Sequence, residues 1–222
     1  MRALAENMRW ILLLGDSNFH YHDGVSWYVS CVPWLSAFST AMFVERTASA
    51  VGVGVTTVGW RNLRARSYER MALQSALSFL DQLKARATVV VALGQNDALD
   101  FTSGIGERVM TGAEEQGYES HVIRYLELLR SDLLAHDCVL SATYLLPFDH
   151  SGAAAFHPSY PKLVERLTRV VLQKTARWKW RTMTYVPSDT AFLADKMHLT
   201  SRGRKEFADA IWGAVVRARD NF

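Results

Sequence analysis

The chain has 222 residues, 49% hydrophobic and 21% charged, a balance typical of a globular protein with enough apolar material for a sizeable core. The net charge of +3 is carried by scattered basic residues, which does not indicate a nucleic-acid partner. No apolar run is long enough to cross a membrane. We expect a single domain over residues 1–222, since α/β domains of this length commonly fold as one unit.

The cysteines and the N-terminal residues indicate in which cellular compartment the protein is expected. Cys31 and Cys138 lie in apolar surroundings without metal-ligand spacing, which favours two buried free thiols in a reducing environment. Only residues 1–8 precede the first predicted strand, so a cleavable signal peptide would remove that strand. The sequence therefore predicts a cytoplasmic protein.

The first half of the chain alternates strands and helices. Residues 10–14 form a continuous apolar run, typical of a strand buried on both faces of a parallel sheet. A long apolar helix is predicted over residues 25–44, followed by a strand rich in glycine and β-branched residues over 50–58. Apolar residues at helical spacing follow over 67–85, and the clearest strand of the chain lies at 88–93.

The second half continues this alternation. Residues 100–117 are polar, aperiodic and contain glycine, and we expect a loop across the top of the sheet, where loops often serve as lids or binding surfaces. The remaining elements are a helix over 118–136, a strand over 139–146, a loop over 147–161, a helix to about residue 178 with Pro161 in its first turn, a short strand over 183–186 and a helix over 201–216.

Five strands alternating with helices define a fold class. Right-handed crossovers between them give a five-stranded parallel sheet with helices on both faces, a three-layer α/β/α fold. In such a sheet, turns that follow strands collect at the carboxyl edge, where ligands bind. Four segments follow or closely trail strand ends there: Gly15-Asp16-Ser17, Gly59, Gly94-Gln95-Asn96-Asp97 and Asp195-Lys196-Met197-His198.

These segments contain the groups needed for acyl transfer. The reaction requires a hydroxyl, an imidazole, a group that orients the imidazole, and a preorganised donor for the oxyanion. These four roles are matched in chemical type, in that order, by Ser17, His198, Asp195 and Asn96. Asp195 precedes His198 by three residues and can reach its ring when the backbone turns back. Gly59 has no side chain, so its N–H can approach a substrate oxygen closely.

Each residue also has a purely structural explanation. Ser17 can cap the following helix, Asn96 can be an ordinary turn residue, and His198 can pack at the start of the last helix. A non-catalytic binding module on the same scaffold is therefore an alternative hypothesis, although the sequence lacks none of the expected catalytic groups. His20, His22 and Asp23 allow a metal-site interpretation, but a solvated loop or the rim of a substrate site fits their spacing better.

In their order along the chain, the four segments resemble the motifs of the SGNH (GDSL-type) hydrolases. The last of them is followed by Leu199-Thr200-Ser201-Arg202-Gly203, so the resemblance extends from the first strand to the last helix. It implies a three-layer α/β/α fold with flavodoxin-like strand order, and serine esterase chemistry that needs no metal and no organic cofactor.

The resemblance also implies individual roles. Ser17 would be the nucleophile, His198 the general base and then acid, and Asp195 the residue that holds His198 in the productive tautomer. The oxyanion hole would comprise the backbone N–H groups of Ser17 and Gly59 and the side-chain amide of Asn96.

We expect hydrolysis of a carboxylic ester with a small acyl group such as acetyl, on a small-molecule, carbohydrate or metabolite substrate. The alternative is an acyltransferase in which the same serine passes the acyl group to an acceptor other than water. Candidate substrate contacts, which could equally pack their loops, are Asn18, Trp60, Phe101 and Phe148.

Overall fold

The computed structural model describes residues 9–15, 54–59, 70–147, 157–186, 188, 191 and 199–219. Its strands are β1 (Arg9–Gly15), β2 (Gly54–Gly59), β3 (Arg86–Ala92), β4 (Val139–Leu145) and β5 (Arg181–Met183). The sheet has the order β2-β1-β3-β4-β5, and all neighbouring strands are parallel. The predicted α/β class with a parallel sheet is confirmed, and the strand order is the flavodoxin-like one.

The prediction of five strands needs a correction at one edge of the sheet. Four strands of six or seven residues form the body of the sheet, whereas β5 has three residues and begins earlier than the predicted strand at 183–186. The reason is the length of its neighbour. Met183 pairs with Leu145, the last residue of β4, so the residues after Met183 have no strand left to pair with.

The helices in the described part of the chain are α3 (Arg70–Gln82), α4 (Gln95–Ser103), α5 (Gly112–Leu134), α7 (Tyr160–Trp178) and α8 (Ser201–Arg219). The helices predicted to end at residue 178 and to begin at residue 201 are confirmed at those ends. The helix predicted over 25–44 lies outside the described residues. None of the helices described is both long enough and apolar enough to cross a bilayer.

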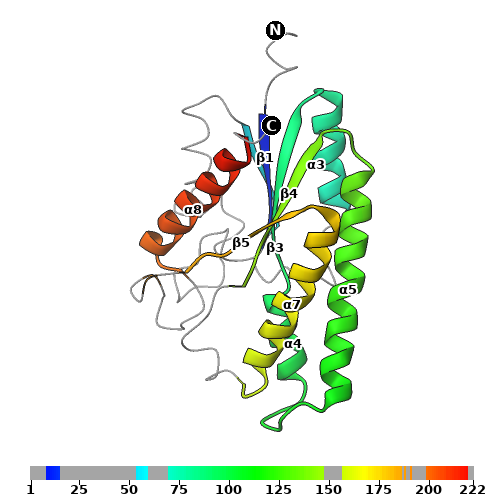
Figure 1. Cartoon of the computed structure of the whole chain (residues 1–222), viewed down its shortest axis with the longest axis vertical. Helices are drawn as coiled ribbons and strands as arrows, with labels where there is room; N and C mark the ends of the chain where they lie inside the picture. Colours follow the sequence, from blue (N-terminus) through cyan, green and yellow to red (C-terminus); the bar gives the residue numbers. More distant parts are fainter. Residues whose placement is uncertain are drawn as a thin grey trace.

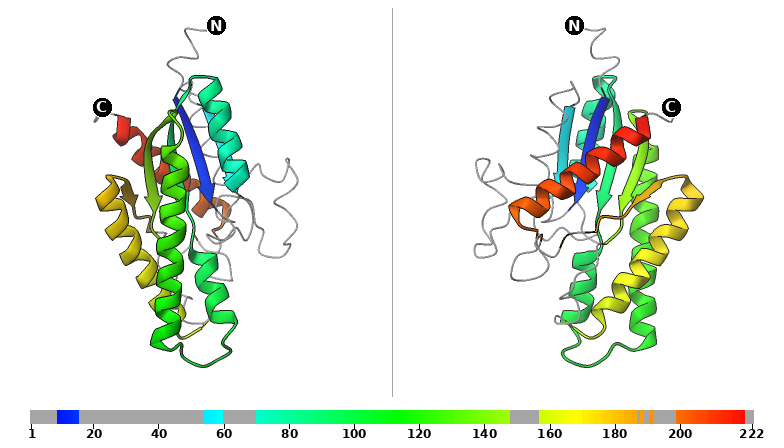
Figure 2. Two further views of the ribbon diagram at one scale, coloured as in Figure 1. Left: turned by 90° about the vertical axis from the view of Figure 1, so that its right-hand side faces the viewer. Right: turned by 60° about the vertical axis from the view of Figure 1, so that its left-hand side comes forward.

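Helices cover both faces of the sheet, because β1 buries its side chains in both directions. Leu12 and Leu14 belong to a core shared with α3, α5 and α7, whereas Ile11 and Leu13 belong to a second core under α8. Figure 1 shows α8 on one side of the strands and the other helices on the opposite side, and Figure 2 shows the same arrangement from two further directions. These are the three layers that the apolar strands predicted.

The predicted loop at 100–117 is wrong over most of its length. α4 continues to Ser103 and α5 begins at Gly112. The N-terminus of α5 is a capping box, in which Thr111 Oγ1 accepts from the backbone N–H of Glu114 while the Glu114 carboxylate accepts from the backbone N–H of Thr111. The cap outweighs the weak helix propensity of two glycines in this segment.

Part of the helical layer extends beyond the sheet. α4 and the first halves of α5 and α7 project past the carboxyl ends of the strands (Figure 1). α5 and α7 are joined there by Arg166, whose guanidinium donates to Glu115 at 2.9 Å and to Glu119 at 2.8 Å. The carboxyl edge therefore has a helical wall beside it.

Candidate functional site

The strand register brings three of the predicted motifs to one point of the sheet edge. Gly15, the first residue of Gly15-Asp16-Ser17, is the register partner of Gly59 on β2. On its other side Gly15 is the partner of Ala92, the last residue of β3. Gly94 follows two residues later, so the segments that contain Ser17, Gly59 and Asn96 start side by side at the carboxyl edge.

The structure describes three of the predicted site residues. Gly59 ends β2, Asn96 lies in the first turn of α4, and Phe101 lies further along α4. The predicted roles of these residues, and of the residues not described, remain predictions. The site residues outside the described part of the chain are Ser17, Asn18, Trp60, Phe148, Asp195 and His198.

The turn that carries Asn96 is sharp and depends on a glycine. Gly94 is the N-cap of α4 and has φ of 105°, in the left-handed region that favours glycine. A Cβ atom on Gly94 would lie 2.9 Å from Leu167 Cδ1 on α7. Both the backbone angle and the lack of space explain why Gly94 begins this motif.

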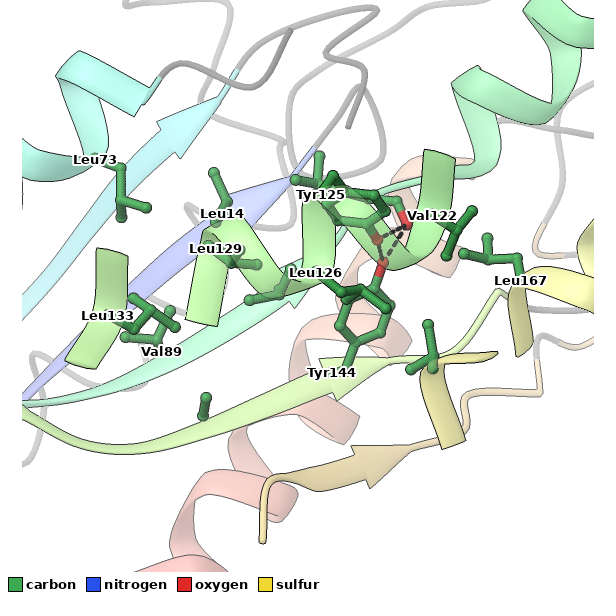
Figure 3. Packing of buried hydrophobic residues seen from close by; sticks show 14 of the residues in the cluster. Leu14, Leu73, Val89, Val122, Tyr125, Leu126, Leu129, Leu133, Tyr144 and Leu167 are labelled. Carbon is green, nitrogen blue, oxygen red and sulfur yellow. Dashed lines mark hydrogen bonds between the residues drawn. The ribbon is translucent and has the colours of Figure 1, made fainter. Parts of the chain in front are cut away.

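Tyrosine hydroxyls from α5 and β4 donate hydrogen bonds to backbone carbonyl groups of the turn at Gly94. Tyr118 donates to the carbonyl oxygen of Gly94 at 3.1 Å, and Tyr144 donates to that of Leu93 at 2.5 Å. Tyr125 is hydrogen-bonded to Tyr144, and Figure 3 shows these two side chains pointing toward one another from α5 and β4. The buried carbonyl groups of Leu93 and Gly94 thus have hydrogen-bond partners in tyrosine side chains.

The surroundings of Tyr118 and Tyr125 favour the protonated form of their hydroxyls. Burial raises the pKa of Tyr118 well above its usual value, and the nearby Asp97 carboxylate raises it further. Burial and the neighbouring Tyr144 do the same to the pKa of Tyr125. Tyr118 therefore stays a hydrogen-bond donor to the turn.

Asp97, the last residue of the motif, is bound by a histidine from α5. Asp97 is wholly buried, and its Oδ1 atom lies 2.8 Å from His121 Nε2. Phe101 contacts the same group, since its ring lies edge-on to Tyr118 at 5.1 Å and tilted to His121 at 5.9 Å. Phe101 thus packs within the helical wall, and its role as a substrate contact stays a prediction.

The residues that flank the segment containing Asp195 and His198 are hydrogen-bonded to each other and to α8, while the segment itself lies outside the described residues. The backbone N–H of Thr200 donates to the carbonyl oxygen of Ala191 at 2.7 Å. Thr200 Oγ1 accepts from the backbone N–H of Gly203 at 3.1 Å in the first turn of α8. A Cβ atom on Gly203 would overlap the Ala191 carbonyl, so this glycine allows α8 to approach Ala191 closely.

A second loop is tied to the start of α7. His157 Nδ1 accepts from the backbone N–H of Ser159 at 3.0 Å, so its Nε2–H donates to the Gly106 carbonyl oxygen at 2.7 Å. Ser159 Oγ accepts from the backbone N–H of Met110 at 2.9 Å. The connection between α4 and α5 is therefore fixed to the helical wall.

Sequence reasoning missed the residues that support the Gly94 turn. Tyr118, His121 and Tyr125 were assigned only to a helix. Their spacing of three and four residues places them on one face of it, which was the available signal. Nothing in the sequence indicates that this face lies under the turn.

At the sequence level, no family profile matches this chain and no curated protein matches it. Solved structures match it over most of its length. Est24, a carbohydrate acetylesterase from Sinorhizobium meliloti, is 14% identical with a TM-score of 0.65, covering 95% of this chain and 99% of its own. A protein from Parabacteroides merdae assigned as a GDSL-like lipase is 15% identical with a TM-score of 0.61, covering 92% of this chain and 94% of its own. This chain has the SGNH (GDSL-type) hydrolase fold.

Another structure with this fold is the extracellular lipase from Streptomyces rimosus. It is 12% identical with a TM-score of 0.58, covering 92% of this chain and 98% of its own. The SGNH fold predicted from four short motifs is thus confirmed by comparisons of the backbone.

Proposed function

We propose that this protein is a serine esterase that hydrolyses a carboxylic ester with a small acyl group. Ser17 is the nucleophile, His198 the general base and then acid, and Asp195 the residue that orients His198. The observation that carries the proposal is the strand register. The partners of Gly15 are Gly59 and Ala92, which supports an arrangement with Ser17 next to both further oxyanion donors.

The reaction proceeds in two steps. Ser17 Oγ attacks the ester carbonyl carbon while His198 accepts the hydroxyl proton. The negative charge on the carbonyl oxygen is stabilised by the N–H groups of Ser17 and Gly59 and by the Asn96 side-chain amide. His198 then protonates the departing alcohol, and water activated by His198 hydrolyses the acyl-enzyme.

Two features of the structure support this chemistry. The hydrogen bond between Thr200 and Ala191 brings together the residues on either side of the segment that contains Asp195 and His198, which suits an Asp and a His that act together. The Gly94 turn is held by buried tyrosine hydroxyls, which suits a donor that must not reorient during the reaction.

The test measures hydrolysis of a short-chain aryl ester by Ser17→Ala and His198→Ala. We expect each to lose at least about 10⁴-fold in kcat, because members of a triad act as a unit. A phosphonate ester probe should form a covalent adduct on Ser17 in the wild-type protein, detected by peptide mass spectrometry.

The matched control is Ser75→Ala, which changes an exposed serine on α3 and should leave kcat unchanged. Circular dichroism checks that the inactive variants are folded. Wild-type turnover in a folded Ser17→Ala variant would rule the proposal out.

A further inference from the structure

The Asp97–His121 pair lies directly next to the proposed oxyanion donor. Asp97 follows Asn96 in the chain, at the third position of α4, where the helix dipole favours a negative charge. Its side chain is 0% exposed, and a carboxylate buried to that degree needs hydrogen-bonded partners. A carboxylate only accepts hydrogen bonds, so the 2.8 Å contact places the proton on His121 Nε2.

The His121 ring is itself held in place. It belongs to α5, its side chain is 19% exposed, and its neighbours are two aromatic rings. Phe101 lies 5.9 Å from it on the α4 side, and Tyr125 lies 6.2 Å from it on α5. A ring packed in this way presents its Nε2–H to Asp97 in a fixed direction.

α5 therefore binds the Gly94 turn at two points on either side of Asn96. Tyr118 holds the carbonyl oxygen of Gly94, and His121 holds the side chain of Asp97. Tyr118 and His121 are one helical turn apart on α5, matching the short distance between Gly94 and Asp97 in the chain.

We propose that His121 is a positioning residue for Asn96 and acts through Asp97. The inference rests on the proposed function, in which the Asn96 amide donates to the oxyanion. Loss of the His121 hydrogen bond removes one donor from the buried Asp97 carboxylate, and the first turn of α4 shifts as a result. The shift moves the Asn96 amide away from the position that the oxyanion occupies in the transition state.

The test compares kcat and KM for the aryl ester in wild-type protein, His121→Leu and His121→Gln. We expect His121→Leu to lower kcat about tenfold or more, since small displacements of a positioned group cost that much. KM should change by less than about twofold, because the donor acts on the transition state rather than on the bound ester. His121→Gln should recover much of the lost kcat, because its amide N–H can donate to Asp97.

The same molecule contains a matched control pair. His136 Nδ1 lies 2.7 Å from Asp81 Oδ2 beside the start of β4, away from the carboxyl edge. His136→Leu removes a histidine–aspartate contact of similar length, in which the histidine is 12% exposed and the aspartate 31% exposed. It should lower the melting temperature without changing kcat. If His121→Leu does not fold, His121→Asn takes its place, because its amide is too short to reach Asp97.

A double variant separates this inference from the proposed function. Asn96→Ala should lower kcat by about 10²–10³. If His121 acts through Asn96, adding His121→Leu to Asn96→Ala should lower kcat little further. Additive losses, or equal kcat in His121→Leu and His136→Leu, would overturn the inference while leaving the esterase intact. A wild-type protein without esterase activity would instead overturn the proposed function.

Discussion

Gly94 combines two constraints at the turn before α4. Its φ of 105° is costly for residues with a side chain, and a Cβ atom there would meet Leu167 Cδ1 at 2.9 Å. Gly104, at the other end of the same helix, has φ of −77°, and a Cβ atom there would make only an ordinary contact with the Asp100 carbonyl oxygen at 3.9 Å. The two glycines of one helix thus have opposite tolerance to substitution.

We expect Gly94→Ala to lower the free energy of unfolding by about 1–3 kcal/mol, because the left-handed backbone is strained by a Cβ atom. The measurement is chemical denaturation of Gly94→Ala alone and in a Leu167→Val background, which removes the atoms that crowd the new methyl group. The Leu167→Val background should recover the part of the lost unfolding free energy that comes from crowding. It should not recover the part that comes from the strained φ angle. Gly104→Ala is the control and should be neutral or slightly stabilising. Equal stability of Gly94→Ala and wild type would contradict the prediction.

Cys138 is a residue whose chemistry is suppressed by its surroundings. Burial and a hydrogen bond with Asp81 raise the pKa of its thiol to about 12. Cys138 is 2% exposed, which confirms the predicted buried free thiol at this position. Cys31 lies outside the described residues.

We expect the Cys138 thiol to be inert in the native protein, because a thiol with a pKa of about 12 has almost no reactive thiolate at neutral pH. The measurement uses a Cys31→Ser variant and a disulfide reagent near neutral pH. One thiol should react after unfolding in guanidinium and none before it. Rapid stoichiometric reaction of the folded variant would contradict the assigned environment.

The glycines in α5 and α8 differ in how closely other atoms pack against them. Gly203 in the first turn of α8 lies so close to Ala191 that a Cβ atom would overlap its carbonyl oxygen. Gly117 in α5 has nothing within 4 Å of the position of a Cβ atom. Gly203 is required by packing, whereas Gly117 only lowers the helix propensity.

We expect Gly203→Ala to lower the free energy of unfolding by about 1–3 kcal/mol, because an added methyl group must displace backbone. It should also lower kcat, since Ala191 and Thr200 flank the segment that contains the proposed catalytic residues Asp195 and His198. Gly117→Ala should raise the free energy of unfolding by about 1 kcal/mol with no change in kcat. Thermal denaturation measures the change in stability of each variant, and ester hydrolysis measures the change in kcat. A Gly203→Ala variant that matches Gly117→Ala in both assays would refute the packing argument.

Elements with strong periodicity or clear end signals were predicted close to their observed bounds. α7 ends at Trp178 and α8 begins at Ser201, as their patterns indicated. The start of α5 was missed, because glycine and polar residues suggested a loop while Thr111 and Glu114 formed a capping box. β5 was misplaced because its extent depends on where β4 ends, which is a tertiary property.

Over the whole molecule, the order of the motifs was enough to predict the fold. Parallel strands with right-handed crossovers send every following turn to one edge, so the positions of Gly15, Gly59 and Gly94 could be inferred without coordinates. The support beneath that edge could not be inferred. His121 and Tyr118 are brought to the turn by the packing of α5, and a single sequence does not specify which turn of a helix meets which loop.

The pairing of Gly15 with Gly59 and Ala92 has a consequence for how activity can change. Strands advance about 3.3 Å per residue, so a slip of one position would separate the donors by more than a hydrogen bond tolerates. In the proposed site, the spacing of the oxyanion donors therefore depends on the backbone hydrogen bonds between β1, β2 and β3. Leu12 and Val89 are buried in the core and cannot contact an ester, yet substitutions there can lower kcat by loosening the strand alignment.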